Sequence, residues 1–213
     1  MSRDDAAAWR WIEAAANQGN PTAMYNAGLL CLQGRNASDS VGGAAAAAAW
    51  WLRGAERGHA GAQHRYASLA YDGAPGVPVS VPDALKWWRA AAAQGHADAL
   101  CSLGCLHQTG SACGTVAVDV GQAAALFEQA AQGGSADGAY HLAYFYAEGV
   151  GTEPDVEVAT ALLQLAANQN HGPALAMLRQ LQQQQQQRHG QAPANAVAEE
   201  DDNELPNLDE SAK

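Results

Sequence analysis

The sequence predicts an all-α fold, a right-handed α/α superhelix in which pairs of helices stack along one axis. A short phrase of two small residues, two variable residues and Gly recurs five times, with Asn replacing Gly in the last copy, at a period of 36 to 39 residues. Such a period is typical of helix-pair solenoids. Composition agrees, because 48% of the 213 residues are apolar and 22 are Gly while only 2 are Phe, which favours closely packed helices over strands.

One helix of each pair, called helix B, ends at the recurring phrase. Gly and Asn can adopt the left-handed conformation that terminates many helices. The ends of helix B are therefore expected at Gly19, Gly58, Gly95, Gly134 and Asn170. A large apolar pair precedes each phrase at one fixed offset: Trp11-Ile12, Trp50-Trp51, Trp87-Trp88, Leu126-Phe127 and Leu162-Leu163.

Three of the tryptophans of helix B are expected to fill the space between helices. Trp11, Trp50 and Trp87 are the first members of their pairs and recur in phase with leucines in the later copies. We therefore expect these three indoles to pack between helices, not to stack on a ligand. The other three tryptophans are expected to be partly exposed on the convex side: Trp9, Trp51 and Trp88.

The second helix of each pair, called helix A, begins with a small residue four positions after each terminating Gly or Asn. A small residue follows a larger one four and five positions further on in most copies, as in Leu103-Gly104 and Leu142-Ala143. A small side chain there lets helix B approach closely. Helix A is expected to begin near the following residues: Ala23, Ala62, Ala99, Gly138 and Ala174.

The fourth copy carries the fullest pattern, with Leu142 to Thr152 reading LAYFYAEGVGT and Ala166-Ala167 closing it. This pattern resembles the Sel-1-like repeat family, a branch of the tetratricopeptide-type α-solenoids, and the resemblance covers most of the chain. It implies about four repeats with a half-repeat cap at each end. It also implies an adaptor or scaffold that holds other proteins in assembly, quality-control or signalling complexes.

The chain is expected to divide into a solenoid over residues 1–187 and a disordered acidic tail over residues 188–213. The tail is too polar to bury the surface that ordering requires. It is expected to be a solubilising segment, with a partner contact through Leu205, Pro206 and Leu208 as the alternative. The solenoid is expected to comprise a half-repeat over 1–19, repeats over 20–58, 59–95, 96–134 and 135–170, and a cap helix over 171–187.

The face of helix A opposite the core is expected to line a concave groove that binds a partner protein or peptide. Tyrosines there offer stiff apolar surface with a hydroxyl that can orient a peptide backbone. The alternative is that Tyr71 and Tyr144 only pack against neighbouring repeats. The expected lining residues are Tyr25, Leu29, His64, Tyr71, Cys101, Cys105, Tyr140 and Tyr144.

Charge and hydropathy exclude several classes of partner. The net charge of -11 argues against nucleic acid or an anionic membrane surface and favours a basic protein partner. No apolar stretch approaches the roughly 18 residues of a membrane span, so no membrane insertion is expected. The expected compartment is the cytoplasm, because the N-terminus lacks the apolar stretch of a secretory signal. The mitochondrial intermembrane space is the alternative.

Cysteines could suggest a metal site, but the sequence favours free thiols. Cys101 and Cys105 stand one helical turn apart, whereas His107 is expected to point roughly 160° away from Cys105. Cys113 lies in the following loop. No metal is therefore expected. The resemblance nevertheless leaves a second function open, a thiol-dependent or metal-binding assembly factor.

No catalytic arrangement is apparent. The histidines at 64, 96, 107 and 141 are scattered over three repeats, and no Ser or Cys has a base and an acid at a recognised spacing. The glycines lie at helix ends and lack the Lys-Ser/Thr ending of a phosphate-binding loop. A non-enzymatic protein without a cofactor is therefore expected.

Overall fold

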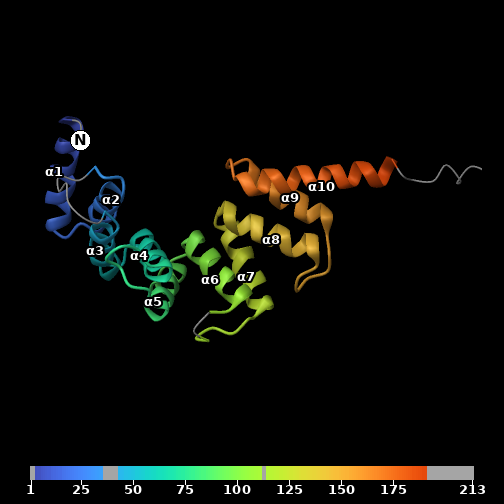
Figure 1. Cartoon of the computed structure of the whole chain (residues 1–213), viewed down its shortest axis with the longest axis horizontal. Coiled ribbons are helices and arrows are strands. Elements are labelled where there is room, and N and C mark those ends of the chain that lie inside the picture. The colour runs from blue at the N-terminus through green and yellow to red at the C-terminus, as the bar shows by residue number, and fades with distance from the viewer. Residues whose placement is uncertain (1–2, 36–42, 112–113, 191–213) are drawn as a thin grey trace, which may run out of the picture.

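The computed structural model describes residues 3–35, 43–111 and 114–190, and Figure 1 shows them as a curved row of helices. This part of the chain contains ten helices and no strand, which confirms the predicted all-α solenoid. The helices are α1 (Arg3–Asn17), α2 (Pro21–Leu32), α3 (Gly43–Glu56), α4 (Ala60–Asp72), α5 (Val81–Ala92), α6 (Ala97–Thr109), α7 (Val120–Gln132), α8 (Ala136–Glu148), α9 (Val156–Ala167) and α10 (Gly172–Gly190).

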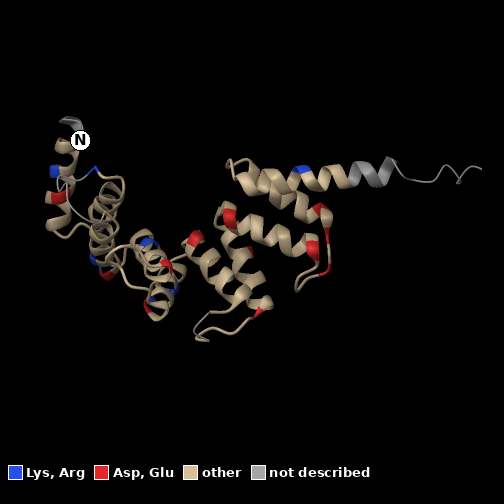
Figure 2. Cartoon of the chain, in the orientation of Figure 1, with Lys and Arg blue, Asp and Glu red and all other residues tan. Residues whose placement is uncertain are grey.

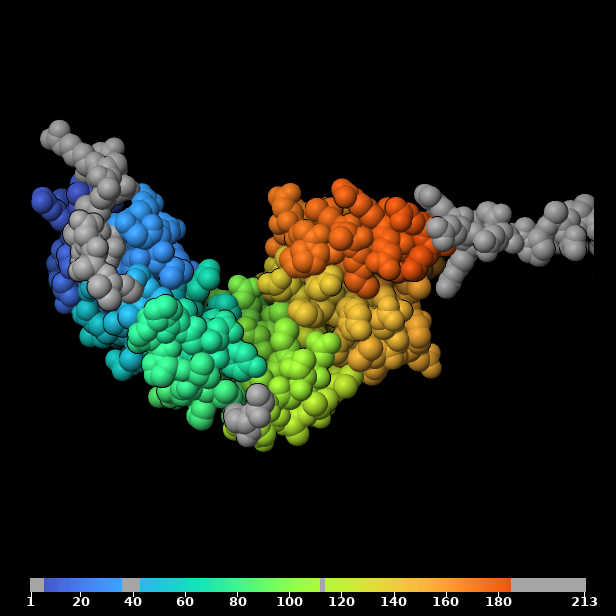
Figure 3. Space-filling view, in the orientation of Figure 1, coloured from blue at the N-terminus to red at the C-terminus, as the bar shows by residue number. Residues whose placement is uncertain are grey.

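The helices form two layers. Each helix contacts the next one along the chain, and in addition α2 contacts α4 and α6 contacts α8. The even-numbered helices are the predicted A helices, and they form the inner layer of the curve. Figure 3 shows the molecule hollowed between the N-terminal helices and α10. The expected cap helix is α10, and the acidic tail lies outside the described residues from position 191 onward.

The expected ends of helix B are confirmed by backbone geometry. Gly19, Gly58, Gly95 and Gly134 have φ values of 95°, 83°, 77° and 89°, in the left-handed region. Asn170 occupies the equivalent place with a φ of 61° and is the one non-glycine residue with positive φ in the described chain. The sharp turn after each B helix therefore has one geometry in all five copies, and it sends the chain directly into the next A helix.

The predicted close approach of helices A and B is also confirmed. A Cβ atom placed on Gly28 of α2 would overlap the Trp51 indole of α3, and one on Gly104 of α6 would lie 2.7 Å from Phe127 Cε1 of α7. The absence of a side chain on each glycine therefore creates the space that the following aromatic ring fills. One core cluster built in this way extends from α4 to α10, and a second joins α1 to α4.

The expectation for the tryptophans is only partly right. Trp50 and Trp87 are half-buried and pack against neighbouring helices as expected, but the other four tryptophans differ from it. Trp51 is 1% exposed and Trp88 is 4% exposed, so the second members of the pairs fill the core, whereas Trp11 is 78% exposed. Trp9 is buried as well and meets Trp50 edge-on at 6.4 Å. The physical reason is that the second member points at the small residue of helix A, while the first member lies about 100° away around helix B.

None of the helices in the described residues combines the length and the apolar character that crossing a bilayer requires.

Candidate functional site

A recurring ring contact joins successive A helices along the inner layer. The residue that caps one A helix packs on an aromatic residue of the A helix before it. Tyr25 stacks on His59 with ring centroids 5.0 Å apart, and Tyr140 packs on His171 at 5.1 Å. Both histidines cap their helices, because each Nδ1 accepts a hydrogen bond from a backbone N–H three residues later at 3.1 Å. The predicted groove residues Tyr25 and Tyr140 thus lie at the contacts between repeats.

A groove of about 390 Å³ lies between α8 and α10. Tyr144 is 39% exposed and Tyr140 is half-buried, so both offer ring surface to this groove. The groove brings together two of the predicted site residues. It is lined by Tyr140, Tyr144, Glu148, Pro173, Ala176, Met177, Gln180, Leu181 and Gln184.

The other predicted groove residues occupy less open positions. Leu29 is half-buried against the core cluster that joins α1 to α4. Tyr71 packs on Trp88 with ring centroids 5.1 Å apart, which is the packing role that the sequence left as an alternative. Cys101 is only 5% exposed, so it is buried beneath the concave face that it was expected to line. Some of the predicted lining residues therefore line the groove between α8 and α10, and the others pack between helices.

Charge is unevenly distributed along the solenoid, as Figure 2 shows. Residues 97–184 contain eight acidic side chains and one basic side chain, Arg179, whereas residues 6–96 contain five acidic and seven basic ones. The groove between α8 and α10 lies in the acidic half, with Glu148 in its lining. A cationic segment near this groove would therefore meet a favourable electrostatic potential.

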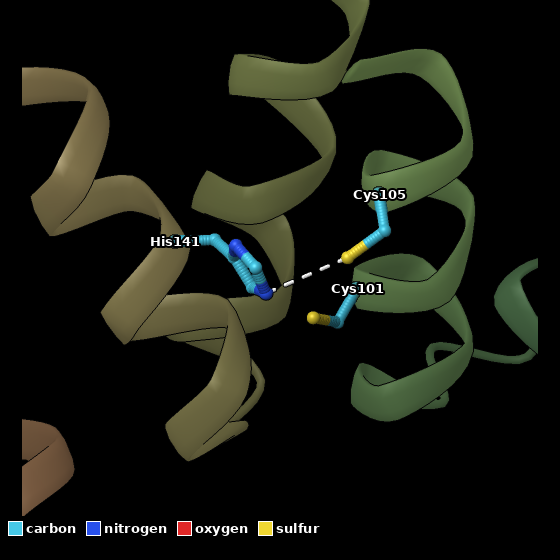
Figure 4. Close-up of side chains that lie close together, drawn as sticks. All are labelled: Cys101, Cys105 and His141. Carbon is cyan, nitrogen blue, oxygen red and sulfur yellow. Dashed lines mark hydrogen bonds between the residues drawn. The ribbon is translucent and has the colours of Figure 1, made fainter. Parts of the chain in front are cut away.

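Three potential metal ligands converge between α6 and α8, as Figure 4 shows. Cys101 and Cys105 project from one face of α6, and His141 projects from α8 toward them. Cys105 Sγ lies 3.5 Å from His141 Nε2, and the two sulfurs and a ring nitrogen all lie within 4.8 Å of one another. His107 is not among them, and Cys113 lies outside the described residues.

Contacts within this cluster shift the pKa values of its three side chains in different directions. The interaction between the two neighbouring thiols is the largest cause of both thiol shifts, raising the pKa of Cys101 and lowering the pKa of Cys105. The hydrogen bond to Cys105 raises the pKa of His141. Cys105 is thus favoured as a thiolate that lies beside the Cys101 thiol and accepts a hydrogen bond from the His141 ring.

A second cluster lies one repeat earlier. His64 of α4 stacks on His96 at 5.0 Å, and one ring nitrogen of each lies within 4.8 Å of a carboxylate oxygen of Asp98. Burial is the main cause that lowers the pKa of His64 to about 4, followed by the neighbouring His96. His64 is therefore neutral at physiological pH, and its Nε2 lies 3.3 Å from Ser102 Oγ.

Sequence reasoning missed His141 as a partner of the two cysteines. It compared Cys105 only with residues of its own repeat, such as His107. Cys105 and His141 are 36 residues apart, one period of the repeat, and consecutive A helices touch along the inner layer. The signal was present in the sequence, because residues one period apart on helix A are neighbours in a solenoid.

Known proteins share this architecture. Five consecutive segments match the model of the Sel1 repeat family, at residues 1–20, 21–59, 60–96, 97–135 and 136–171. A Sel1 repeat protein from Oxalobacter formigenes is 32% identical with a TM-score of 0.70, and the match covers 85% of this chain and 50% of that one.

A second solved structure is c5321, a protective antigen of uropathogenic Escherichia coli strains that displays an SLR fold. It is 26% identical with a TM-score of 0.68, and the match covers 84% of this chain and 37% of that one. The chain thus spans half or less of the length of these two structures. No curated protein gives a significant match.

Proposed function

The chain belongs to the Sel1 repeat family, and from that premise we propose that it is a non-catalytic interaction module whose inner face binds a basic segment of a partner protein. Proteins built from Sel1 repeats commonly serve as protein-interaction scaffolds. The observation that carries the proposal is the groove between α8 and α10, where two tyrosines from successive turns of α8 lie beside an acidic side chain.

The groove has the size and the surface for a peptide. Its volume of about 390 Å³ suits a few side chains of an extended segment. Tyr140 and Tyr144 supply aromatic surface with hydroxyl groups, and Met177 and Leu181 of α10 form an apolar wall opposite them. Because all of these residues stand on helices, binding requires little rearrangement.

Charge selects the kind of segment. Glu148 lies in the groove lining. Asp137, near the start of the same helix, is 66% exposed, although its Oδ1 lies 2.8 Å from His171 Nε2. Arg179 is the one Lys or Arg residue in the stretch 97–184 that surrounds the groove. A segment with Lys or Arg beside an apolar anchor therefore fits better than an acidic one.

The test is to select, from a library of random peptides, those that bind the full chain, and then to measure the affinities of the enriched peptides. We expect enrichment of peptides that combine basic and apolar residues. Replacing Tyr140 and Tyr144 together by Ala should weaken their binding about tenfold or more, as for buried aromatic anchors at interfaces. Raising the salt concentration should weaken binding further.

The matched control is Trp11→Ala, which removes an exposed aromatic side chain from α1, in the outer layer and far along the chain from the groove. Circular dichroism should show unchanged helicity in both variants. Peptides that bind the double tyrosine variant as tightly as the original chain would place the binding surface elsewhere. Enrichment of acidic peptides would contradict the proposed charge preference.

A further inference from the structure

The cluster between α6 and α8 has a chemistry that peptide binding does not use. Two groups of three metal-ligating side chains occur in the described residues, His64 with His96 and Asp98, and Cys101 with Cys105 and His141. In the first group the two imidazoles stack face to face, and Asp98 Oδ1 accepts a hydrogen bond from Ser135. The second group offers two sulfurs and an imidazole nitrogen with no competing carboxylate, which is a ligand set for a thiophilic metal ion.

The separations in the second group are close to those of a tetrahedral zinc site. Zinc binds Cys sulfur at about 2.3 Å and His nitrogen at about 2.0–2.1 Å, so tetrahedral angles put the two ligand atoms about 3.6 Å apart. Cys105 Sγ and His141 Nε2 are 3.5 Å apart. The longest separation in the group is within 4.8 Å, about 1 Å more than the sulfur–sulfur edge of such a site. Rotation of the cysteine side chains can shorten it without moving either helix.

Packing fixes the imidazole in the orientation that binding needs. The His141 ring stacks on Phe127 with centroids 4.9 Å apart and planes 12° apart, and Tyr140 meets it edge-on at 5.4 Å. Phe127 is itself held over Gly104, where no side chain intervenes. Residues that orient a ligand in this way raise metal affinity, because less freedom is lost on binding.

We propose that Cys101, Cys105 and His141 bind one zinc ion between α6 and α8, with the fourth coordination position open to the inner face. Two of the three ligands are half-buried, so a water molecule or a side chain of a bound partner can complete the tetrahedron. The ion would link two successive repeats. In a solenoid each repeat contacts only its neighbours, so such a link stabilises an interface that would otherwise depend on packing alone.

The test uses the full chain, reduced and freed of metal with a chelator, and titrated with Co²⁺ and then Zn²⁺. We expect one equivalent of Co²⁺ to give the absorption of a thiolate-bound tetrahedral cobalt ion, and one equivalent of Zn²⁺ to abolish it. The midpoint of thermal unfolding should rise with zinc. Binding of Cu⁺ in a parallel anaerobic titration, without binding of Zn²⁺ or Co²⁺, would overturn the assignment to zinc.

Variants locate the ion. Cys105→Ser and His141→Gln should each weaken zinc binding by at least about 100-fold, since even the loss of a supporting contact costs 10–100-fold. Cys31→Ser and His64→Gln are the controls, one removing a distant thiol and the other a member of the histidine cluster, and both should bind zinc as the original chain does. Because the first two side chains are half-buried, the metal-free variants should keep their helicity. Stoichiometric binding that survives Cys105→Ser, or no binding by the original chain, would overturn the proposal.

Discussion

Trp51 occupies the space that a side chain on Gly28 would need, and its Nε1 donates a hydrogen bond to the carbonyl oxygen of Tyr25 at 3.0 Å. Gly28→Ala should therefore destabilise the fold by about 1–3 kcal/mol, because the indole is fully buried and has to move. Chemical denaturation with the tryptophan fluorescence as the probe measures this change.

The control for this substitution is Gly121→Ala. Gly121 also lies inside a helix, but a Cβ there would meet only Asp119 Oδ1 at 3.6 Å, an ordinary contact. Since Ala is the better helix former, this variant should be unchanged or slightly more stable. Equal stability of Gly28→Ala and the original chain would mean that Trp51 is not packed against α2 as described.

Asn170 ends α9 in the left-handed conformation that glycines adopt after the other four B helices. Asn170→Ala should destabilise the chain by about 1–2 kcal/mol, because Ala tolerates a positive φ less well than Asn does. Asn170→Gly should change stability by less than about 1 kcal/mol. Thermal unfolding, monitored by circular dichroism, distinguishes the Ala variant from the Gly variant.

Asn168→Ala provides the matched control two residues earlier. Asn168 is exposed and has a φ of -62°, so the same replacement there carries no backbone strain. Its effect should stay within about 0.5 kcal/mol. A similar loss in both variants would show that the Asn side chain, and not the backbone geometry, is what matters at position 170.

His64 should make stability depend on pH. Its pKa is lowered from 6.5 to about 4, so between these pH values the unfolded chain binds more protons than the folded one. The stabilisation is complete above pH 6.5 and is lost as the pH falls toward 4. We expect a loss of about 1–2 kcal/mol between pH 7.5 and pH 5, because His64 is only partly buried.

His64→Tyr isolates this contribution. Tyr occupies the equivalent position in α2 and α8, where Tyr25 and Tyr140 pack on the histidines that cap the following A helices. The variant can therefore keep a ring contact with His96 while removing the titrating group. Urea unfolding at the two pH values should show a smaller loss for the variant. Equal losses in both proteins would contradict a depressed pKa at His64.

The helix pairs could be predicted from the sequence because their signals are local. A Gly that follows the recurring pair of small residues, such as Gly58, indicates a left-handed turn, and a small residue within helix A, such as Gly104, indicates a close helix contact. The choice between adjacent tryptophans could not be made in this way. Trp50 and Trp51 are equally apolar and both contact neighbouring helices, so only the three-dimensional position of Gly28 shows which indole is enclosed.

The contacts between repeats were harder to predict for a related reason. Periodicity assigns a residue to a face of its own helix, but the partner of that face belongs to another repeat. Cys101 was assigned to the groove surface by its phase, and it is buried because α8 covers it with His141. The same phase applies to Tyr144, which is exposed and lines the groove between α8 and α10.

Cys105 should react as a thiolate in the metal-free chain. The neighbouring Cys101 thiol is the largest cause that lowers its pKa, and contacts with His141 add to this effect. Iodoacetamide reacts with the thiolate form, so alkylation of Cys105 should persist at pH values where an ordinary thiol is protonated and slow. Mass spectrometry of the labelled peptides across pH 5 to 9 measures the profile.

Cys101→Ala should move the pH profile of Cys105 alkylation to higher pH, because it removes the neighbouring thiol that stabilises the thiolate while leaving the access to Cys105 from the inner face unchanged. Each unit by which the Cys105 pKa then exceeds 6 should slow alkylation at pH 6 about tenfold. Cys31 is an internal control, since burial raises its pKa and shields it from the reagent. Identical profiles for the original chain and Cys101→Ala would show that the Cys101 thiol does not stabilise the Cys105 thiolate.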